Sequence, residues 1–440
     1  MHRPVVILGL FALLVCAGSA SSASGGRAAA GTTFAADADA YVTAAAPKRN
    51  FGKARTLRAA KRPSTKSYVH FTLPGIDAPV TSATLRLYVR AGSKGLAVRS
   101  TSGTWSERSI TFKNAPRAGS VVARAKGVRA RRWVSLNVTR AVKGKSAVSF
   151  ALTGAGTIAS REAGSKRPQL IVKATAPTLL AAGDVAFCGQ PYDEATAALI
   201  TKIPGTVAAL GDLAYEHGSA AEFAACYQPS WGAFKGRTRP AIGNHEYEAD
   251  PGAAGYFGYW GARAGSPGQA WYSYDLGGWH VISLNSNCSF VGGCFVGSPQ
   301  EAWLRADLAA HPKGCTLAYW HHPRFSGGQV TNELDLQPIW QDLYDANADL
   351  VLSGHAHNYQ RFAPQNAAGA PDPARGIREF VVGTGGNPTL HAVAAIANTE
   401  VMNNDTWGVL KLTLRNSGYD WQFLRAAGGI FTDSGSQACH

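Results

Sequence analysis

Hydrophobic and polar residues alternate over short runs in the first part of the chain. Residues 83–89, 133–138 and 147–152 show this most clearly. A period of two, with β-branched residues, is typical of a strand that buries one face, and clusters of Gly, Pro, Ser and Asn between the runs supply turns. No long amphipathic helix pattern interrupts them. We therefore predict that residues 31–174 form an all-β sandwich.

The pattern changes after a linker predicted at residues 175–180. Apolar strands now alternate with loops and helical stretches, which is typical of an α/β domain. Helices are predicted at residues 193–202, 220–226 and 299–310, and Ser298 is a candidate N-cap for the last of them. Residues 181–440 are therefore expected to form a separate α/β domain.

The first 30 residues are predicted to be a signal peptide. Arg3 precedes an apolar run from Pro4 to Ala17, and small residues follow through Ala30. The apolar run is too short to span a bilayer, and no later stretch is long enough either. The mature protein is therefore expected to be secreted and to have no transmembrane segment.

Cysteine usage agrees with export. Six cysteines follow the leader, and an even number in an oxidising compartment predicts disulfides. Six cysteines allow 15 pairings in principle, and the sequence leaves the pairing open. Cys288 with Cys294 would close a short loop. A zinc site is disfavoured because no pair has CxxC spacing.

Charge differs sharply between the two parts of the chain. Residues 31–176 contain 27 Lys and Arg against 5 Asp and Glu, whereas residues 177–440 contain 14 against 23. Such a switch is typical of a domain boundary. The basic excess indicates either solubility alone or binding to anionic polymers such as uronic-acid glycans, wall teichoic acids or nucleic acid. Nucleic acid is the least favoured partner, because aromatic residues that could stack on bases are sparse.

Metal-binding residue types recur at five strand ends of the second domain. Each time, a short apolar strand runs into a loop that presents Asp, Asn, Tyr or His. Ligand sites of open α/β sheets lie at the carboxyl ends of strands, so these side chains are expected to meet. Each motif alone is weak, but the five together indicate a site for two cations. The motifs are Gly183-Asp184, Gly211-Asp212-Leu213-Ala214-Tyr215, Gly243-Asn244-His245-Glu246, His321-His322-Pro323 and Gly354-His355-Ala356-His357.

From Gly183 to about Arg361 the motifs resemble those of the calcineurin-like metallophosphoesterase superfamily, and within it the purple acid phosphatase branch. The resemblance implies a four-layer α/β/β/α sandwich and two metal ions. It implies that Asp184, Tyr215 and His357 bind the first metal, that Asp212 bridges both, and that Asn244, His321 and His355 bind the second. His321 is preferred over His322 because the family's ligand precedes the proline by two positions.

Two positions favour the purple acid phosphatase branch. Many superfamily members carry a histidine two residues after the first aspartate, where this chain has Ala186. Purple acid phosphatases place a tyrosine three residues after the second aspartate, which is Tyr215 here. A phenol with an ordinary pKa of about 10 binds as phenolate only to a strong Lewis acid, so Tyr215 predicts Fe(III), paired with Fe(II), Zn or Mn. A tyrosine that only packs beside the aspartates is the alternative.

The resemblance also implies the chemistry. We expect hydrolysis of phosphate monoesters by metal-activated hydroxide, as in an acid phosphatase. His245 is expected to be the catalytic proton donor or a phosphate clamp. His322 and Arg361 are weaker candidates for substrate contacts, and a structural role is an equal alternative for both and for Glu246. The Gly-rich segment 383–387 is interpreted as a backbone turn facing the metal cleft.

The first domain resembles the DNRLRE domain, a carbohydrate-binding-module-like β-sandwich of exported bacterial proteins. The resemblance implies a jelly-roll-like fold that attaches to a glycan or cell surface. With the leader and the high Ala, Gly and Arg content, it indicates an extracellular bacterial enzyme. The matching segments include residues 37–42, 50–52, 85–89, 105–107, 160–164 and 168–170.

Two other functions stay open. A phosphodiesterase or nucleotidase would use the same ligands, because the ligand set determines the reaction type and not the size of the leaving group. A non-catalytic protein that binds cell walls or glycans is the alternative from another class. It is disfavoured because every expected ligand position holds a chemically competent residue.

Overall fold

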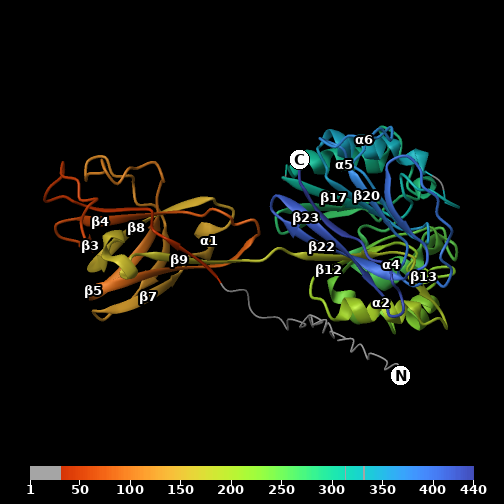
Figure 1. Cartoon of the computed structure of the whole chain (residues 1–440), viewed down its shortest axis with the longest axis horizontal. Helices are drawn as coiled ribbons and strands as arrows, with labels where there is room; N and C mark the ends of the chain where they lie inside the picture. The colour runs from red at the N-terminus through yellow and green to blue at the C-terminus, as the bar shows by residue number, and fades with distance from the viewer. Residues whose placement is uncertain (1–30, 313, 331) are drawn as a thin grey trace, which may run out of the picture.

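The computed structural model describes residues 31–312, 314–330 and 332–440, and the signal peptide predicted at residues 1–30 lies outside the described residues. The described chain forms two domains joined by a short connection (Figure 1). Strand β10 begins at Thr178, inside the segment 175–180 predicted as the linker, so the connection outside strands is only residues 175–177. No helix in the described ranges is long and apolar enough to cross a membrane.

The N-terminal domain is an antiparallel β-sandwich, which confirms the predicted class. Its long strand β5 pairs with β7 and β9 along its first half and with β6 and β8 along its second. Leu85 and Leu87 of β5 point into the core, while the alternating Arg86 and Tyr88 stay partly exposed. The elements are β1 (Thr32–Ala35), β2 (Ala38–Thr43), β3 (Thr56–Ala59), β4 (Thr65–Thr72), β5 (Val80–Ser100), β6 (Val121–Ala125), β7 (Arg132–Asn137), α1 (Thr139–Val142), β8 (Ala147–Ala159) and β9 (Gln169–Ala174).

Two mixed sheets form the centre of the C-terminal domain. The first has the strand order β14-β12-β10-β22-β23-β24, and the second has the order β15-β16-β17-β18-β20-β19-β21. Strands β11 and β13 form a separate short ladder. The strands are β10 (Thr178–Ala182), β11 (Ala186–Phe187), β12 (Thr206–Leu210), β13 (Ala214–Tyr215), β14 (Thr238–Ala241), β15 (Tyr272–Leu276), β16 (Trp279–Ser283), β17 (Cys315–Tyr319), β18 (Leu350–Ser353), β19 (Tyr359–Phe362), β20 (Arg378–Val382), β21 (Thr399–Asn403), β22 (Gly408–Arg415), β23 (Gly418–Arg425) and β24 (Ser434–Ala438).

Helices cover the outer faces of the two sheets, so the domain has the predicted α/β/β/α layers. Helix α2 lies against the first sheet, and α5 and α6 lie against the second (Figure 1). Leu304 of α5 and Trp340 of α6 pack with Val351 of β18 in one core cluster. The helices are α2 (Tyr192–Thr201), α3 (Ala220–Glu222), α4 (Ala254–Trp260), α5 (Pro299–Ala310) and α6 (Gln337–Asp345).

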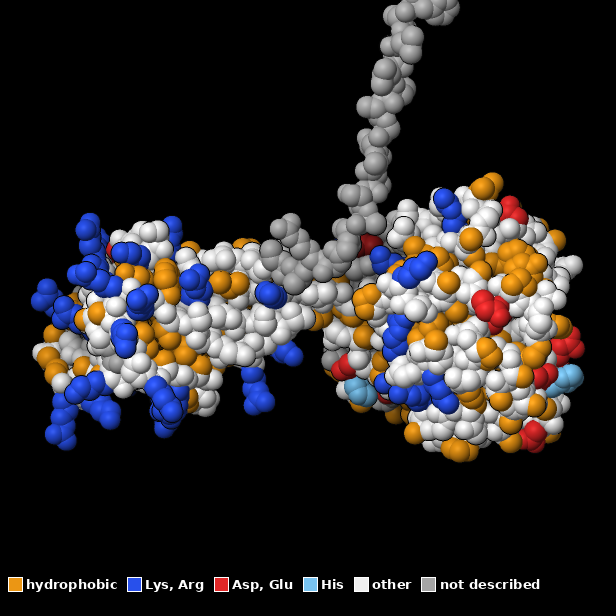
Figure 2. Space-filling model, turned by 90° about the horizontal axis from the view of Figure 1, so that it is seen from below, with side chains coloured by type: hydrophobic (Ala, Val, Ile, Leu, Met, Phe, Trp, Pro, Cys, Tyr) orange, Lys and Arg blue, Asp and Glu red, His pale blue; other side chains and the backbone are white. Residues whose placement is uncertain are grey.

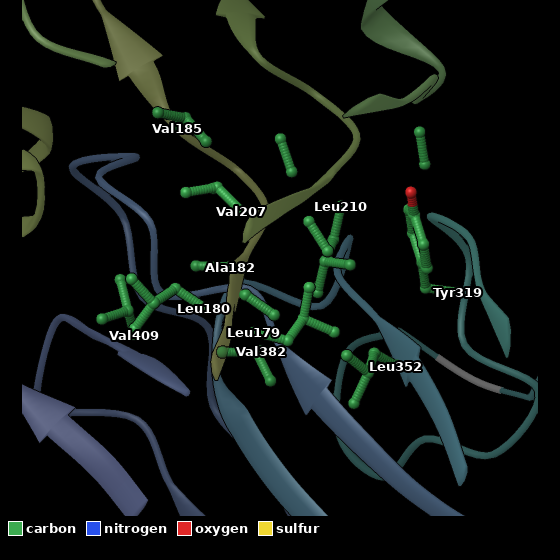
Figure 3. Close-up of a cluster of buried hydrophobic side chains, with 14 of the residues drawn as sticks. Leu179, Leu180, Ala182, Val185, Val207, Leu210, Tyr319, Leu352, Val382 and Val409 are labelled. Carbon is green, nitrogen blue, oxygen red and sulfur yellow. The ribbon is translucent and has the colours of Figure 1, made fainter. Parts of the chain in front are cut away.

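The core between the sheets consists mainly of aliphatic side chains. Leu179, Val207 and Leu210 from the first sheet meet Leu352 and other residues of the second in one buried cluster (Figure 3). Burial of a side chain of this size contributes about 1.5–3 kcal/mol. This core fixes the two sheets against each other just before the strand ends that carry the predicted ligands.

The predicted helices are present, with one difference in capping. Segment 220–226 is split between α3 and a π-helical turn at Phe223–Tyr227. Ser298 occupies the N-cap position of α5, but its side chain makes no capping hydrogen bond. The Glu301 carboxylate instead accepts the amide proton of Gly297, at 2.8 Å. Ser298 is thus the N-cap residue by position, while Glu301 of the first turn bonds the residue before it.

The six cysteines after the leader form disulfides, as predicted, and the structure gives the pairing that the sequence leaves open. Cys288 pairs with Cys294 in the short loop that sequence separation suggests. Cys315 of β17 pairs with Cys439, 124 residues away, and so ties the chain end to the second sheet. A third bridge joins Cys188 to Cys226.

A small polar contact joins the two domains. The Arg415 guanidinium lies 3.2 Å from the Asp77 carboxylate. Ser417 donates both its amide and its hydroxyl protons to the same carboxylate, at 2.9 and 2.7 Å. The β-sandwich therefore sits at the β22–β23 turn.

Candidate metal centre

The five sequence motifs meet at one edge of the two sheets. Strands β10, β12 and β14 run parallel, and so do β17 and β18. Their carboxyl ends therefore fall on one side of each sheet, and the packed sheets bring the loops together. Asp184 follows β10, Asp212 and Tyr215 follow β12, Asn244 follows β14, His321 follows β17, and His355 and His357 follow β18.

The backbone at four of these positions is left-handed. The φ angles are 60° at Asp184, 51° at Asp212, 67° at His355 and 46° at His357. Residues other than glycine rarely adopt such angles, and they persist where the surrounding structure enforces them, commonly at functional sites. Gly243 supports the arrangement, because a Cβ there would lie 2.1 Å from Oδ1 of Asp212.

Asp184, Tyr215 and His357 converge beside Asp212. The Tyr215 hydroxyl lies 3.0 Å from Oδ1 of Asp184 and 3.2 Å from Oδ2 of Asp212. Nε2 of His357 lies 2.9 Å from that hydroxyl and 3.2 Å from Oδ1 of Asp184. All four side chains are buried. These are the residues expected at the first metal and the bridge.

A second cluster adjoins the first through the same carboxylate oxygen. Nε2 of His321 lies 3.0 Å from Oδ2 of Asp212. It also lies 3.1 Å from Oδ1 of Asn244 and 3.2 Å from Nδ1 of His355. These are the residues expected at the second metal.

The donor atoms fit two cations that share Asp212. Ligand atoms about 2.1 Å from an octahedral cation lie about 3 Å from one another, as the atoms of both clusters do. Moreover, the single phenol proton of Tyr215 cannot satisfy two carboxylates and an imidazole nitrogen at once. Ligand atoms of Asp184, Asp212 and His357 lie within 4.8 Å of one another, and so do those of Asp212, His321 and His355.

Backbone carbonyls orient two of the imidazoles. Nδ1 of His321 donates to the carbonyl of Leu210, at 2.8 Å, and Nδ1 of His357 donates to that of Thr389, at 3.1 Å. Each bond leaves Nε2 free to face the cluster. The positions of these carbonyls do not follow from the motifs.

Glu246 holds two ligand loops together, a role that the sequence leaves open. Its buried carboxylate accepts amide protons from Asp212, Leu213 and Gly243, at 3.0, 2.7 and 2.7 Å. Burial and the nearby Asp212 raise the pKa of Glu246 to about 7. The side chain therefore braces the loops after β12 and β14 and has no atom left over for substrate.

The electrostatics of the cluster favour cation binding. Burial, helped by His321, lowers the pKa of His355 to about 3, which keeps this imidazole neutral as a ligand must be. Burial would lower the pKa of His321, but Asp212 raises it to about 9. Burial and Asp184 raise the pKa of Tyr215 well above its ordinary value. Only a strongly polarising cation would hold this side chain as phenolate.

His245 lies beside the first cluster with one nitrogen held by the chain. Its Nδ1 lies 3.1 Å from Oε1 of Glu248 and also contacts the carbonyl of Glu216. Its Nε2 lies 3.8 Å from Oδ2 of Asp212, and its ring lies 4.6 Å from that of Tyr215. The imidazole is about a quarter exposed, at 26%. It thus presents Nε2 beside the shared carboxylate.

His322 lies behind His355. Its Nδ1 lies 2.8 Å from Oγ of Ser286, and its ring lies 4.3 Å from that of His355. Burial, with His321 adding to it, lowers the pKa of His322 to about 3. The neutral ring packs against a ligand of the second cluster.

Arg361 does not join the site, contrary to the weak expectation from sequence. Its guanidinium pairs with Asp433, at 2.8 Å, and with Glu400, and lies over the Trp421 ring at 5.0 Å. Arg361 belongs to strand β19 (Tyr359–Phe362) and not to the loop after β18 that carries His355 and His357. We withdraw it as a candidate substrate contact.

The Gly-rich segment 383–387 passes directly behind the first cluster. A Cβ on Gly383 would lie 2.8 Å from Oδ2 of Asp184, and the Asn387 amide donates to the Asp184 carbonyl at 2.8 Å. The segment is therefore a backbone turn packed against the first cluster. The same loop brings in His391, whose ring stacks on His357 at 4.4 Å. No spacing or motif in the sequence indicates this histidine.

Comparisons with known families agree with both halves of the chain. Residues 177–359 match the calcineurin-like phosphoesterase model, and residues 30–174 match carbohydrate-binding module family 96.

Similar proteins include purple acid phosphatases. Purple acid phosphatase 21 of Arabidopsis thaliana is 31% identical over 201 residues, which is 40% of this chain and 43% of the relative. An uncharacterized protein of Mycobacterium tuberculosis is 33% identical over 184 residues, which is 33% of this chain and 35% of the relative. The matches therefore span less than half the length of these curated relatives.

Among solved structures, the purple acid phosphatase PPD1 from yellow lupin seeds shares 18% identity with a TM-score of 0.47. The match covers 87% of this chain and 73% of that one. The family models carry the assignment: this chain belongs to the calcineurin-like phosphoesterase family, with an N-terminal domain of carbohydrate-binding module family 96 and distant purple acid phosphatase homologues.

Proposed function

We propose that this protein is a secreted dinuclear-metal phosphoesterase that hydrolyses phosphate monoesters, as acid phosphatases do. The observation that carries the proposal is the contact of one oxygen, Oδ2 of Asp212, with both ligand clusters. The presence of purple acid phosphatases among the relatives supports a phosphate monoester as the substrate. Disulfides persist in oxidising compartments, and their presence here supports secretion.

Most residues of the site would serve to hold the two cations in place. Asp184, Tyr215 and His357 would hold the first cation, Asn244, His321 and His355 the second, and Asp212 both. When bound, the cation pair supplies Lewis acidity to the phosphate and makes the attacking water more acidic. The buried and braced loops keep the ligands fixed, so little reorganisation is required during reaction.

His245 supplies the remaining group that the reaction needs. Hydrolysis leaves an alkoxide that must gain a proton, and Nε2 of His245 lies 3.8 Å from the shared carboxylate oxygen. Two acceptors at its Nδ1, the Glu216 carbonyl and the Glu248 carboxylate, fix the orientation of the ring and leave Nε2 beside the shared carboxylate. We therefore assign His245 as the proton donor, with a phosphate clamp as the alternative.

The ligand types also indicate the metals. Tyr215 is buried beside two carboxylates, which makes its phenolate costly unless Fe(III) or a similar Lewis acid binds it. The second cluster offers an amide oxygen and two imidazoles besides the shared carboxylate, which suits Fe(II), Zn or Mn. We propose an Fe(III) site next to a divalent one.

A second proposed function belongs to the N-terminal domain, which we infer binds an anionic glycan or cell-wall polymer. Blue Lys and Arg side chains spread over this domain with few red ones, whereas both signs mix on the other domain (Figure 2). Tyr88 and Trp133 lie directly opposite each other on β5 and β7, with rings 5.5 Å apart. Arg86 lies over Trp133, at 4.7 Å, and Lys166 over Tyr88, at 4.8 Å. The rings hold two cations in place on an outward strand face, where they can meet carboxylates or phosphates.

Replacement His245→Ala tests the catalytic assignment. As proton donor, His245 should matter more for an alkyl phosphate than for p-nitrophenyl phosphate, whose leaving group needs little protonation. We expect kcat to fall about 100-fold or more for the alkyl ester, with metal content unchanged. An equal loss for both substrates would indicate a clamp, and unchanged turnover would exclude both roles. His311→Ala, at the end of α5, is the matched control.

Activity on bis-p-nitrophenyl phosphate alone would favour a phosphodiesterase.

Replacement Tyr215→Phe tests the metal assignment. A tyrosinate bound to Fe(III) absorbs visible light, so the purified wild-type protein should be coloured. The variant should lose the band while it retains iron, because three carboxylate and imidazole ligands of the first cluster remain. A colourless wild-type protein with full metal content would instead indicate Zn or Mn.

Replacement of Arg86 and Lys166 by Gln tests the glycan-binding face. The full chain should be retarded in gels that contain polygalacturonate but not in gels that contain neutral dextran. The double variant should lose most of this retardation. Arg49→Gln with Lys113→Gln removes the same charge elsewhere in the domain. An equal loss in both double variants would show that only net charge matters.

A further inference from the structure

The segment 389–391 contacts the proposed ligand His357 at three points. The Thr389 carbonyl accepts from Nδ1 of His357, at 3.1 Å. The His391 amide donates to the His357 carbonyl, at 2.9 Å, and the His391 ring stacks on the His357 ring. The His391 side chain is therefore held next to the first cluster by its own backbone.

The loop continues from there towards the segment that follows His321. A Cβ on Gly327 would lie 1.9 Å from the Ala394 carbonyl oxygen, and one on Gly328 would lie 2.3 Å from that of Ala392. Only glycine allows so close an approach. Residues 389–394 thus run from His357 to the segment at Gly327 and Gly328.

The His391 ring has hydrogen-bonding capacity that the chain does not use. Its Nδ1 is buried and has no hydrogen-bond partner among the described residues, while the residue as a whole remains partly exposed. A neutral imidazole carries one proton, and a buried donor without an acceptor is costlier than a bare nitrogen. The proton therefore belongs on Nε2, where it can serve a bound group.

We propose that His391 is a substrate-contact residue whose Nε2–H donates a hydrogen bond to a phosphoryl oxygen of the ester. The inference rests on the proposed phosphoesterase function. His245 packs on Tyr215 and His391 packs on His357, so two imidazoles that are not ligands flank the first cluster. A phosphoryl group has three terminal oxygens, and those not taken up by the cations need N–H donors.

Tungstate binding by the metal-loaded protein tests the proposal, because this tetrahedral oxyanion mimics phosphate and does not react. His391→Phe keeps a ring on His357 without the N–H, whereas His391→Gln keeps an N–H donor without the ring. We expect the Phe variant to bind tungstate about tenfold more weakly in calorimetry. The Gln variant should stay within about threefold of wild type. Both should keep their metals, and His311→Ala should match wild type.

Two outcomes would overturn the proposal. Tungstate affinity in His391→Phe that equals the wild-type value would show that the N–H makes no contact. Metal loss in His391→Gln would show that the ring acts through His357 and not on the substrate. Failure of the proposed function is separately visible: the wild-type protein would then bind tungstate in a His391-dependent way but hydrolyse no phosphate ester.

Discussion

The contact of Oδ2 of Asp212 with both the Tyr215 hydroxyl and Nε2 of His321 is the constraint on which the whole site depends. A buried carboxylate is costly unless opposite charge surrounds it. Here one carboxylate lies among imidazoles, a phenol and a second aspartate, with its backbone left-handed and Glu246 bound to its amide. Two cations would relieve this crowding, and they would have to lie next to each other because they share an oxygen.

The architecture serves to hold that oxygen still. Asp212 follows β12 of the first sheet and His321 follows β17 of the second, so their separation depends on how the sheets pack. Close-packed interiors transmit small displacements, and the aliphatic cluster around Leu210 and Leu352 lies just below the ligand loops. The Cys315–Cys439 disulfide joins β17 of the second sheet to the residue that follows β24 of the first sheet. The packing of the two sheets thus sets the distances between the metal ligands, because the ligands lie at the ends of the packed strands.

The sequence predicted what depends on local pattern. Period-two runs predicted the β-sandwich. Five strand-to-loop junctions predicted one cluster of metal-binding side chains, because parallel strands place their carboxyl ends together, and the family resemblance selected the seven proposed ligands among them. Features that depend on neighbours in three dimensions could not be predicted from the sequence. The role of Arg361 depends on Asp433, 72 residues away, and the location of His391 depends on a loop with no motif. Ser298 takes the predicted N-cap position of α5, but the lack of a capping bond from its side chain did not follow from the sequence.

The most direct test is the metal content of Asp212→Ala compared with that of His355→Ala and His357→Ala. Each histidine belongs to one cluster, whereas Asp212 belongs to both. We predict about two metal ions per wild-type chain and about one in each histidine variant. We predict almost none in Asp212→Ala, with all variants folded by circular dichroism. An Asp212→Ala protein that retains one fully occupied metal would contradict the shared-carboxylate account.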